Sequence, residues 1–203
     1  MNRLSQLGLT AGTLIIMAAT GACTRELTFN DAELEIIGTD STAGIMPLYT
    51  VDDPADTSVL NAVSSDLSSE DLKSDYYRIL KMRMLANVKD TSNEGVGIAA
   101  PQVGISKRLV AVQRFDKDGE PFEFYPNIRL LNLSEEKAWG WEGCLSVPGM
   151  RDTVLRSKSV VISYIDEKSM VEKRDTVEGF TAVIFQHEID HLEGILYIER
   201  KKL

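Results

Sequence analysis

The two histidines of this chain are its strongest structural constraint, because both lie in the short stretch Q-H-E-I-D-H at residues 186–191. Residues i and i+4 share one face of a helix, so His187 and His191 can present two imidazole nitrogens to one ion. Glu188 lies beside the first histidine, where its carboxylate can reach a water on that ion without binding the ion. This is the H-E-x-x-H arrangement of metal-dependent hydrolases, although the pattern also occurs as two surface histidines with acidic neighbours.

A catalytic metal site needs a third protein ligand and an open position. Cys144 is the candidate, in the segment W-E-G-C-L-S-V-P at residues 141–148. A lone cysteine is more often a buried structural residue. A thiolate with two imidazoles, however, makes a compact site for a divalent transition metal, so we expect Cys144 to join the histidines.

The segment G-V-G-I-A-A-P-Q at residues 95–102 is built mainly of small residues, Gly97 among them. Small residues let the backbone pass close to another group. The segment lacks the lysine and the following helix that a phosphate cradle needs. Its last residue, Gln102, carries a neutral amide that suits a developing oxyanion, but it could equally be an exposed polar residue.

Residues 1–22 have the pattern of a targeting signal. Arg3 supplies a positive charge, residues 7–19 are apolar and uncharged, and the small residues 20–22 lead into Cys23. The apolar run is short for a permanent membrane span. The stretch resembles a bacterial lipoprotein signal, in which the cysteine is lipidated and becomes the new N-terminus.

This resemblance implies an exported protein anchored to a membrane through Cys23, in the periplasm or cell envelope. Thr20 departs from it, because such signals usually have leucine or a similar residue there. The alternatives are an ordinary signal peptide, or an uncleaved apolar N-terminus on a cytoplasmic protein. Residues 24–45 are polar and acidic without a sustained period, so we expect residues 23–45 to form the lipid attachment site and a spacer, followed by one domain at 46–203.

The hydrophobic pattern predicts an α+β fold, with mostly antiparallel sheet packed around a central metal-binding helix. A first helix should open at Ser68 and carry an apolar stripe that repeats every four residues. That stripe consists of Leu72, Tyr76, Leu80, Met84 and Val88. Strands are expected over residues 108–112, 128–133, 159–165 and 171–177, with a hairpin turn at 116–119 and a last helix over 179–192 that ends near Gly194.

The formal net charge of −9 makes the chain acidic. An acidic chain is repelled by phosphate backbones, so nucleic acid is not an expected partner.

Three motifs together resemble those of the peptide deformylase family: G-x-G-I-A-A-P-Q, E-G-C-L-S and H-E-x-D-H, in this order. The resemblance runs from about residue 45 to the C-terminus and includes M-P-L-Y at 46–49 and V-P-G-M-R at 147–151. Ile98 stands where the family usually has leucine, and Tyr125-Pro126-Asn127 inverts a common Asn-Pro order. Some members carry a basic C-terminal helix that docks on the ribosome; because this sequence lacks it, we do not expect ribosome docking.

The resemblance implies an enzyme that removes the formyl group from N-formylmethionyl peptides. Cys144, His187 and His191 would hold the metal, and Glu188 would move the proton of the attacking water. The oxyanion would be met by the Gln102 side chain and the Leu145 backbone N–H. The family typically uses Fe²⁺, and because the same ligands serve Zn²⁺, Ni²⁺ or Co²⁺, the sequence does not choose among these metals.

Supporting residues follow from the same resemblance. Glu142 is expected to form a structural pair with Arg156, and Asp190 to support the ligands or to fix the helix by a salt bridge. Arg151 is a candidate for contact with the substrate backbone. The methionine side chain needs an apolar pocket, although each candidate could equally be plain core. The pocket candidates are Val96, Gly97, Phe180, Val183 and Ile184.

Two other functional classes fit parts of the pattern. One is an exported metallopeptidase with the same ligands. The other is a lipoprotein that binds formyl peptides without turnover, which the presence of Glu188 disfavours because a pure binder needs no general base.

Overall fold

The structure is a computed structural model that describes residues 26–38, 44–93 and 95–200. Cys23 and the signal-like residues 1–22 lie outside the described residues, so their lipidation and cleavage stay predictions. Over the described ranges, none of the helices has the length and apolarity needed to cross a membrane.

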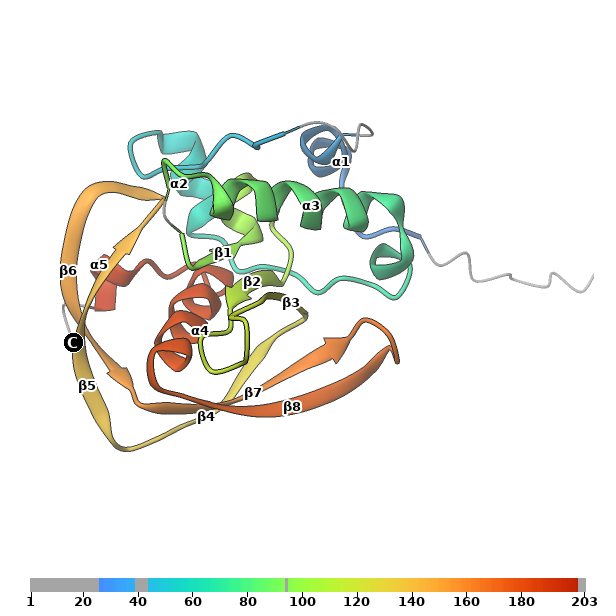
Figure 1. Cartoon of the computed structure of the whole chain (residues 1–203). Helices are drawn as coiled ribbons and strands as arrows, with labels where there is room; N and C mark the ends of the chain where they lie inside the picture. The colour runs from blue at the N-terminus through green and yellow to red at the C-terminus, as the bar shows by residue number, and fades with distance from the viewer. Residues whose placement is uncertain (1–25, 39–43, 94, 201–203) are drawn as a thin grey trace, which may run out of the picture.

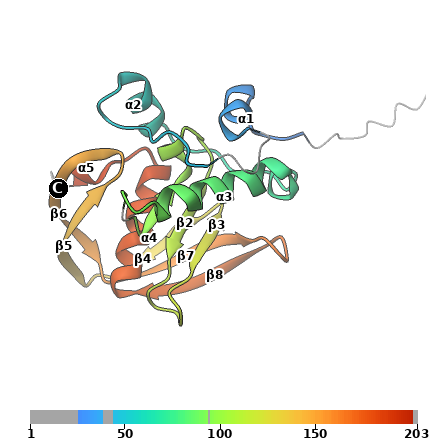
Figure 2. The same ribbon diagram turned by 45° about the horizontal axis from the view of Figure 1, so that its top comes forward.

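Helix α4 (Gly179–Leu192) lies at the centre of the domain, with the other elements arranged around it (Figures 1 and 2). Its sequence G-F-T-A-V-I-F-Q-H-E-I-D-H-L is apolar on most sides, as expected for a helix buried in a core. Ala182, Phe185 and Leu192 are fully buried among residues from the surrounding strands. The predicted central helix is therefore confirmed. It ends just before Gly194, whose φ of +69° carries the chain away in the left-handed conformation that glycine adopts readily.

Three antiparallel sheets surround this helix. The first contains β1 (Gly97–Ala99), β2 (Leu109–Gln113) and β3 (Phe122–Pro126). The second has the order β4 (Arg129–Leu133), β7 (Ser159–Asp166) and β8 (Val171–Glu178). The third is a hairpin of β5 (Lys137–Cys144) and β6 (Val147–Ser157). The four predicted strands correspond to β2, β4, β7 and β8 within a residue or two, and the predicted turn joins β2 to β3.

The β5–β6 hairpin curves around one side of α4 (Figure 1). Gln186 of α4 fastens the two together, because its side chain accepts a hydrogen bond from the Ser157 N–H (3.0 Å) and donates one to the Ser157 carbonyl (2.9 Å). The short helix α5 (Tyr197–Arg200) lies between α4 and the hairpin. The hairpin thus forms a wall whose inner side faces the histidine helix.

Helix α3 (Asp75–Lys89) packs over the first sheet and buries Leu80, Met84 and Val88, as the apolar stripe predicts. Its predicted start at Ser68 is wrong. Ser68 and Asp71 do cap each other, but they cap only the 3₁₀ turn η1 (Asp71–Lys73). The α-helix begins after Ser74, whose hydroxyl accepts a hydrogen bond from the Tyr77 N–H (3.1 Å).

Part of the expected spacer belongs to the folded domain. Helix α1 (Asp31–Ile37) has a capping box between Asn30 and Glu33, and Ile37 is fully buried in the core beside α3. Arg83 of α3 donates hydrogen bonds to the carbonyls of residues 36 and 37, both at 2.8 Å. A seven-residue helix is too short to show a sustained period, which explains why the sequence pattern missed it. A second short helix, α2 (Pro54–Leu60), and the 3₁₀ turn η2 (Ala100–Val103) complete the described elements.

Candidate metal centre and active site

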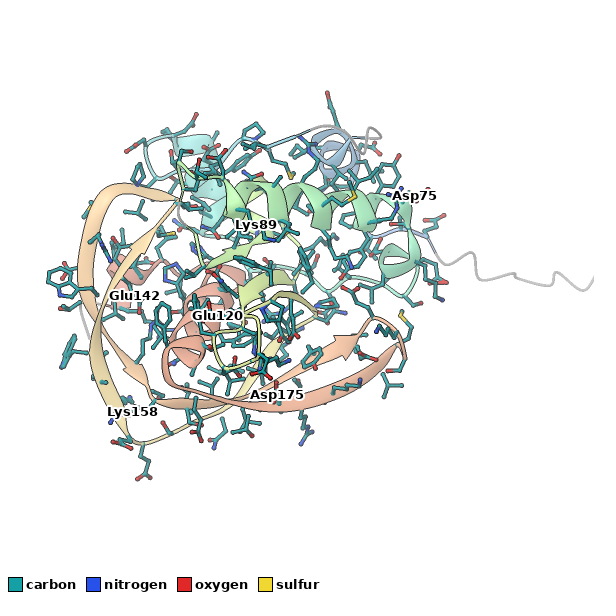
Figure 3. All side chains as sticks on the ribbon, in the orientation of Figure 1. Asp75, Lys89, Glu120, Glu142, Lys158 and Asp175 are labelled. Carbon is teal, nitrogen blue, oxygen red and sulfur yellow. The ribbon has the colours of Figure 1, made fainter. Side chains whose placement is uncertain are left out.

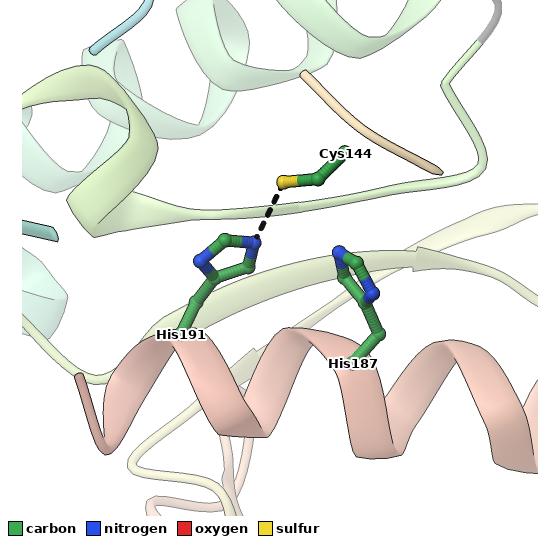
Figure 4. Close-up of side chains that lie close together, drawn as sticks. All are labelled: Cys144, His187 and His191. Atoms are coloured by element: carbon green, nitrogen blue, oxygen red, sulfur yellow. Dashed lines mark hydrogen bonds between the residues drawn. The ribbon is translucent and has the colours of Figure 1, made fainter. Parts of the chain in front are cut away.

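His187 and His191 project from the same side of α4, with ring centroids 5.1 Å apart (Figure 4). Nδ1 of His187 lies 2.8 Å from a carboxylate oxygen of Glu142 on β5. An ionised carboxylate only accepts hydrogen bonds, so Nδ1 carries the proton and Nε2 is left free to bind a metal.

Cys144 ends β5 directly opposite these two rings, and its sulfur lies 3.2 Å from Nε2 of His191 (Figure 4). The sulfur and one nitrogen of each histidine all lie within 4.8 Å of one another. One thiolate and two imidazoles form a donor set typical of catalytic transition-metal sites, which leave a position open for water or substrate. The donor set predicted from the sequence is therefore assembled in the structure and fits one divalent transition metal.

The charge balance favours the metal-binding form of the cysteine. Burial disfavours the thiolate, but the adjacent rings of His191 and His187 lower the pKa of Cys144 well below its usual value. Burial also lowers the pKa of His187, but contacts with Cys144 and Glu142 outweigh it and raise that pKa to about 10 in the absence of a metal. A metal that binds Nε2 therefore displaces the second ring proton, while Nδ1 keeps its proton. A thiolate is the species that binds metal ions, so the site is prepared for a cation.

A chain of ionic contacts runs from the metal ligand His187 into the core. Arg156 of β6 holds both carboxylate oxygens of Glu142 (2.8 and 3.0 Å) and also contacts Asp190 of α4 (2.5 Å). Asp190 is held in turn by Arg200 of α5 (3.0 Å). The Glu142–Arg156 pair is thus present. Asp190 contacts Arg156 and Arg200, which fixes α4 against its neighbours, and it supports His187 indirectly through Arg156 and Glu142.

Gln102, in η2, is buried rather than an exposed polar residue. Its side-chain oxygen accepts a hydrogen bond from the Ala99 N–H (2.8 Å). That bond orients the amide nitrogen towards the centre, 3.5 Å from the Cys144 sulfur and 3.3 Å from the Ser146 hydroxyl. The amide is therefore fixed as a donor beside the three ligands.

Glu188 is only 4% exposed, and its Oε2 has no hydrogen-bond partner among the described residues. Burial is the main cause that raises its pKa to about 7. A buried carboxyl group is costly unless something balances it. An unpartnered carboxyl beside a metal donor set is a candidate proton acceptor, since a pKa near neutrality suits general acid–base catalysis.

Gly97 of β1 lies against this carboxyl group. A Cβ added at Gly97 would overlap Oε1 of Glu188 and would lie 2.8 Å from Cγ2 of Ile184. Strand β1 can approach α4 this closely only because residue 97 has no side chain.

Replacing Gly97 with alanine is expected to displace Glu188 and to lower kcat by roughly 100-fold, since misplacing a catalytic group by about 1 Å costs that much. Steady-state kinetics with a formyl peptide, together with metal content, would test this. Gly140 has open space around its Cβ position and lies outside the cavity lining, so Gly140→Ala is the matched control and should keep wild-type kcat. Wild-type kinetics in Gly97→Ala would show that the carboxyl position does not matter.

A cavity of about 610 Å³ opens over the centre. It is lined by every substrate-binding candidate named from the sequence and by most of the catalytic ones. These are Val96, Gly97, Gln102, Cys144, Leu145, Arg151, Phe180, Val183, Ile184, His187 and Glu188. His191 lies deeper, at 1% exposure. The structure therefore brings the three sequence motifs together around one cavity.

Some residues at the centre were not predicted from the sequence. The ring of Tyr197 in α5 stacks on His187, with centroids 6.0 Å apart, and its hydroxyl donates a hydrogen bond to the Met150 carbonyl (3.0 Å). Ser146 contacts both Gln102 and Cys144. No local pattern marks these residues, because their roles depend on how distant segments pack.

Comparison with known proteins agrees with this arrangement. The family described as polypeptide deformylase matches residues 45–203. A peptide deformylase of Leptospira biflexa is 38% identical over 152 residues, which is 71% of this chain and 83% of that protein.

Solved structures of a class I type b peptide deformylase from Acinetobacter baumannii have the same fold. Its complex with Met-Ala-Ser is 34% identical and covers 77% of this chain and 98% of that one, with a TM-score of 0.68. Its complex with actinonin is also 34% identical and covers 78% and 99%, with a TM-score of 0.68. By the extent of these matches, the chain belongs to the peptide deformylase family of metal-dependent hydrolases.

Proposed function

We propose that this member of the family removes the formyl group from N-formylmethionyl peptides outside the cytoplasm, held at a membrane by a lipid on Cys23. The observation that carries the reaction is one shared cavity, where the fixed Gln102 amide and the buried Glu188 meet the donor set of Cys144, His187 and His191. Oε2 of Glu188 has no hydrogen-bond partner within the described part of the chain. The Acinetobacter baumannii relative binds Met-Ala-Ser, which has the form of a deformylated product.

The chemistry is hydrolysis of a formamide to formate and a free amine. A divalent transition metal at the three ligands, Fe²⁺ by resemblance to the family, supplies Lewis-acid activation of the attacking water. Glu188 accepts the proton of that water and returns it to the leaving amine nitrogen. The Gln102 amide and the Leu145 backbone N–H donate to the oxyanion that develops on the formyl oxygen. Leu145 lies in the turn between β5 and β6, beside Cys144.

The substrate's methionine side chain is assigned to the apolar part of the cavity. Val96 enters from the segment before β1, and Val183 and Ile184 from the turn of α4 that precedes His187. Phe180 lies at the mouth, 56% exposed, with its ring 5.3 Å from that of Phe115. Arg151 lines the same cavity, and we expect its guanidinium to donate hydrogen bonds to the peptide backbone.

The location outside the cytoplasm is supported by the sequence that precedes the domain. Arg3, the apolar run at 7–19 and Cys23 follow the order of a lipoprotein signal. We expect Cys23 to be labelled by a palmitate analogue and the protein to fractionate with membranes. A soluble cytoplasmic protein that retains Met1 would refute the location.

The reaction is tested by formate release from formyl-Met-Ala. We expect formate from this peptide and no cleavage of Met-Ala, because the chemistry is directed at the formamide. Cleavage of the free-amine peptide would identify a peptidase instead. Peptide binding without any turnover by the metal-loaded protein would identify a binding protein.

A further inference from the structure

The β5–β6 hairpin carries an apolar outer face beside the cavity. Trp139 and Trp141 are the only tryptophans of the chain, and they are 65% and 69% exposed. Because they lie two residues apart on β5, they project from the same face of the strand. Leu155, which is 43% exposed, is paired with Trp139 across the hairpin and projects from the same face. We call Trp139, Trp141 and Leu155 the tryptophan face.

The inner face of the hairpin is already occupied, so the tryptophan face is its free side. Glu142, Val154 and Arg156 alternate with the exposed residues and point inwards, where they are buried. The hairpin is a two-stranded sheet, and side chains project from it on the side away from α4 (Figure 3, where Glu142 is labelled). Among the described residues, neither indole ring makes a hydrogen bond or a ring contact. Exposed apolar surface of this kind marks an interaction site more often than an isolated apolar residue does.

The tryptophan face is continuous with the active-site cavity. Trp141 and Met150 line the cavity together with Cys144 and Arg151. Trp139 and Leu155 continue the same surface along the hairpin, away from the metal ligands. A strand rises about 3.3 Å per residue, so Trp141 lies about 10 Å and Trp139 about 17 Å from Cys144 along β5. An extended peptide with its formyl end at the metal site would reach Trp141 with about its third residue and Trp139 one or two residues later.

We infer that the tryptophan face binds apolar side chains of the peptide downstream of the formylmethionine, and that the enzyme therefore prefers formyl peptides with apolar residues from about the third position onward. This inference rests on the proposed function, since it names the peptides that the same site takes. Tryptophan is among the residues that most often dominate binding energy once a partner covers them. A polar peptide would leave both indoles in water.

The test compares two formylated pentapeptides, formyl-Met-Ala-Leu-Leu-Leu and formyl-Met-Ala-Ser-Ser-Ser. We expect kcat/KM for the leucine peptide to exceed that for the serine peptide by roughly tenfold, the effect of one well-buried contact. In the double variant Trp139→Ala/Trp141→Ala the ratio should fall towards one. Val63→Ala removes another exposed apolar side chain, 68% exposed and outside the cavity lining, and should leave the ratio at its wild-type value. The three substituted side chains are all at the surface, so thermal melting should confirm folded variants.

Fluorescence gives a second readout, because the two indoles are the only tryptophan signal of the full-length chain. In the Glu188→Gln variant, chosen to prevent turnover, the leucine peptide should shift the emission to shorter wavelength and the serine peptide should not. A shift with phosphatidylcholine vesicles but none with the leucine peptide would overturn the inference and assign the face to a membrane surface. An unchanged ratio in the double variant would also overturn it.

Failure of this inference is distinguishable from failure of the proposed function. Formate release from formyl-Met-Ala by the wild-type protein tests the reaction without involving positions beyond the second. If that release occurs and the two pentapeptides react equally well, only the preference is refuted. If no formyl peptide is hydrolysed, both the proposed function and the peptide preference are refuted.

Discussion

Replacing Glu188 with glutamine is expected to lower kcat by about 100- to 10,000-fold, the usual contribution of general acid–base catalysis. This corresponds to roughly 3 to 5 kcal/mol of transition-state stabilisation. The physical reason is that an amide cannot accept the proton of the attacking water. In Glu188 the buried Oε2 has no hydrogen-bond partner among the described residues, and the side chain lines the cavity. Glutamine has nearly the same shape, so the close contact with Gly97 is preserved and the fold should not change.

Formate release from formyl-Met-Ala measures the effect, and metal content is measured on the same sample. The variant should keep its bound metal, because Glu188 is not one of the three clustered ligands. Glu172→Gln, on an exposed part of β8, makes the same chemical change away from the site and should keep wild-type kcat. A kcat for Glu188→Gln of the same order as wild type would exclude the carboxyl group as the proton acceptor.

Replacing Cys144 with serine is expected to abolish both metal binding and activity. A serine hydroxyl stays protonated near neutral pH and is a poor ligand for a soft or borderline transition metal, whereas the low pKa of Cys144 supplies a thiolate. With only His187 and His191 left, the site has two of its three protein ligands. Elemental analysis of anaerobically purified protein should find about one metal per wild-type chain and none above background in the variant.

Thermal melting provides an independent readout of the same change. A ligand that binds only the native state stabilises it, so a chelator should lower the Tm of the wild-type protein and leave that of Cys144→Ser unaffected. Glu142→Gln is the graded control: it keeps all three ligands but weakens the partner of His187, and it should lower metal affinity by about 10- to 100-fold. Wild-type metal content in Cys144→Ser would refute the assigned donor set.

Much of the site could be predicted because its chemistry is concentrated in local patterns. His187, Glu188 and His191 lie on one continuous helix, so their relative positions follow from helix geometry alone. Cys144 and Gln102 could be named as candidates only because few other residues offer a thiolate or a suitably placed amide. Their positions relative to the helix depend on the packing of β5 and η2, which no short pattern specifies, and the resemblance to a family supplied that link.

The features that the sequence did not predict depend on long-range packing. Tyr197 and Arg200 contact α4 only because the chain reverses direction after Gly194. Neither residue belongs to a periodic sequence pattern that would have predicted this contact. The β5–β6 hairpin was not recognised as a sheet of its own, because its outer face exposes Trp139 and Trp141 and so lacks the usual alternation of apolar and polar residues. Two capping signals, Ser68 and Ser74, lie six residues apart in the sequence. Local propensity does not decide which of these serines starts the α-helix.

The central position of α4 has a consequence for how the protein folds. Strands β2, β3, β7 and β8 all bury apolar side chains against this helix, which follows every one of them in the chain. This half of the core can form only once α4 has been synthesised, whereas α3 and the first sheet share a separate cluster that contains no residue of α4. Capture of the ion also waits for α4, because Cys144 on β5 has both of its imidazole partners on that helix.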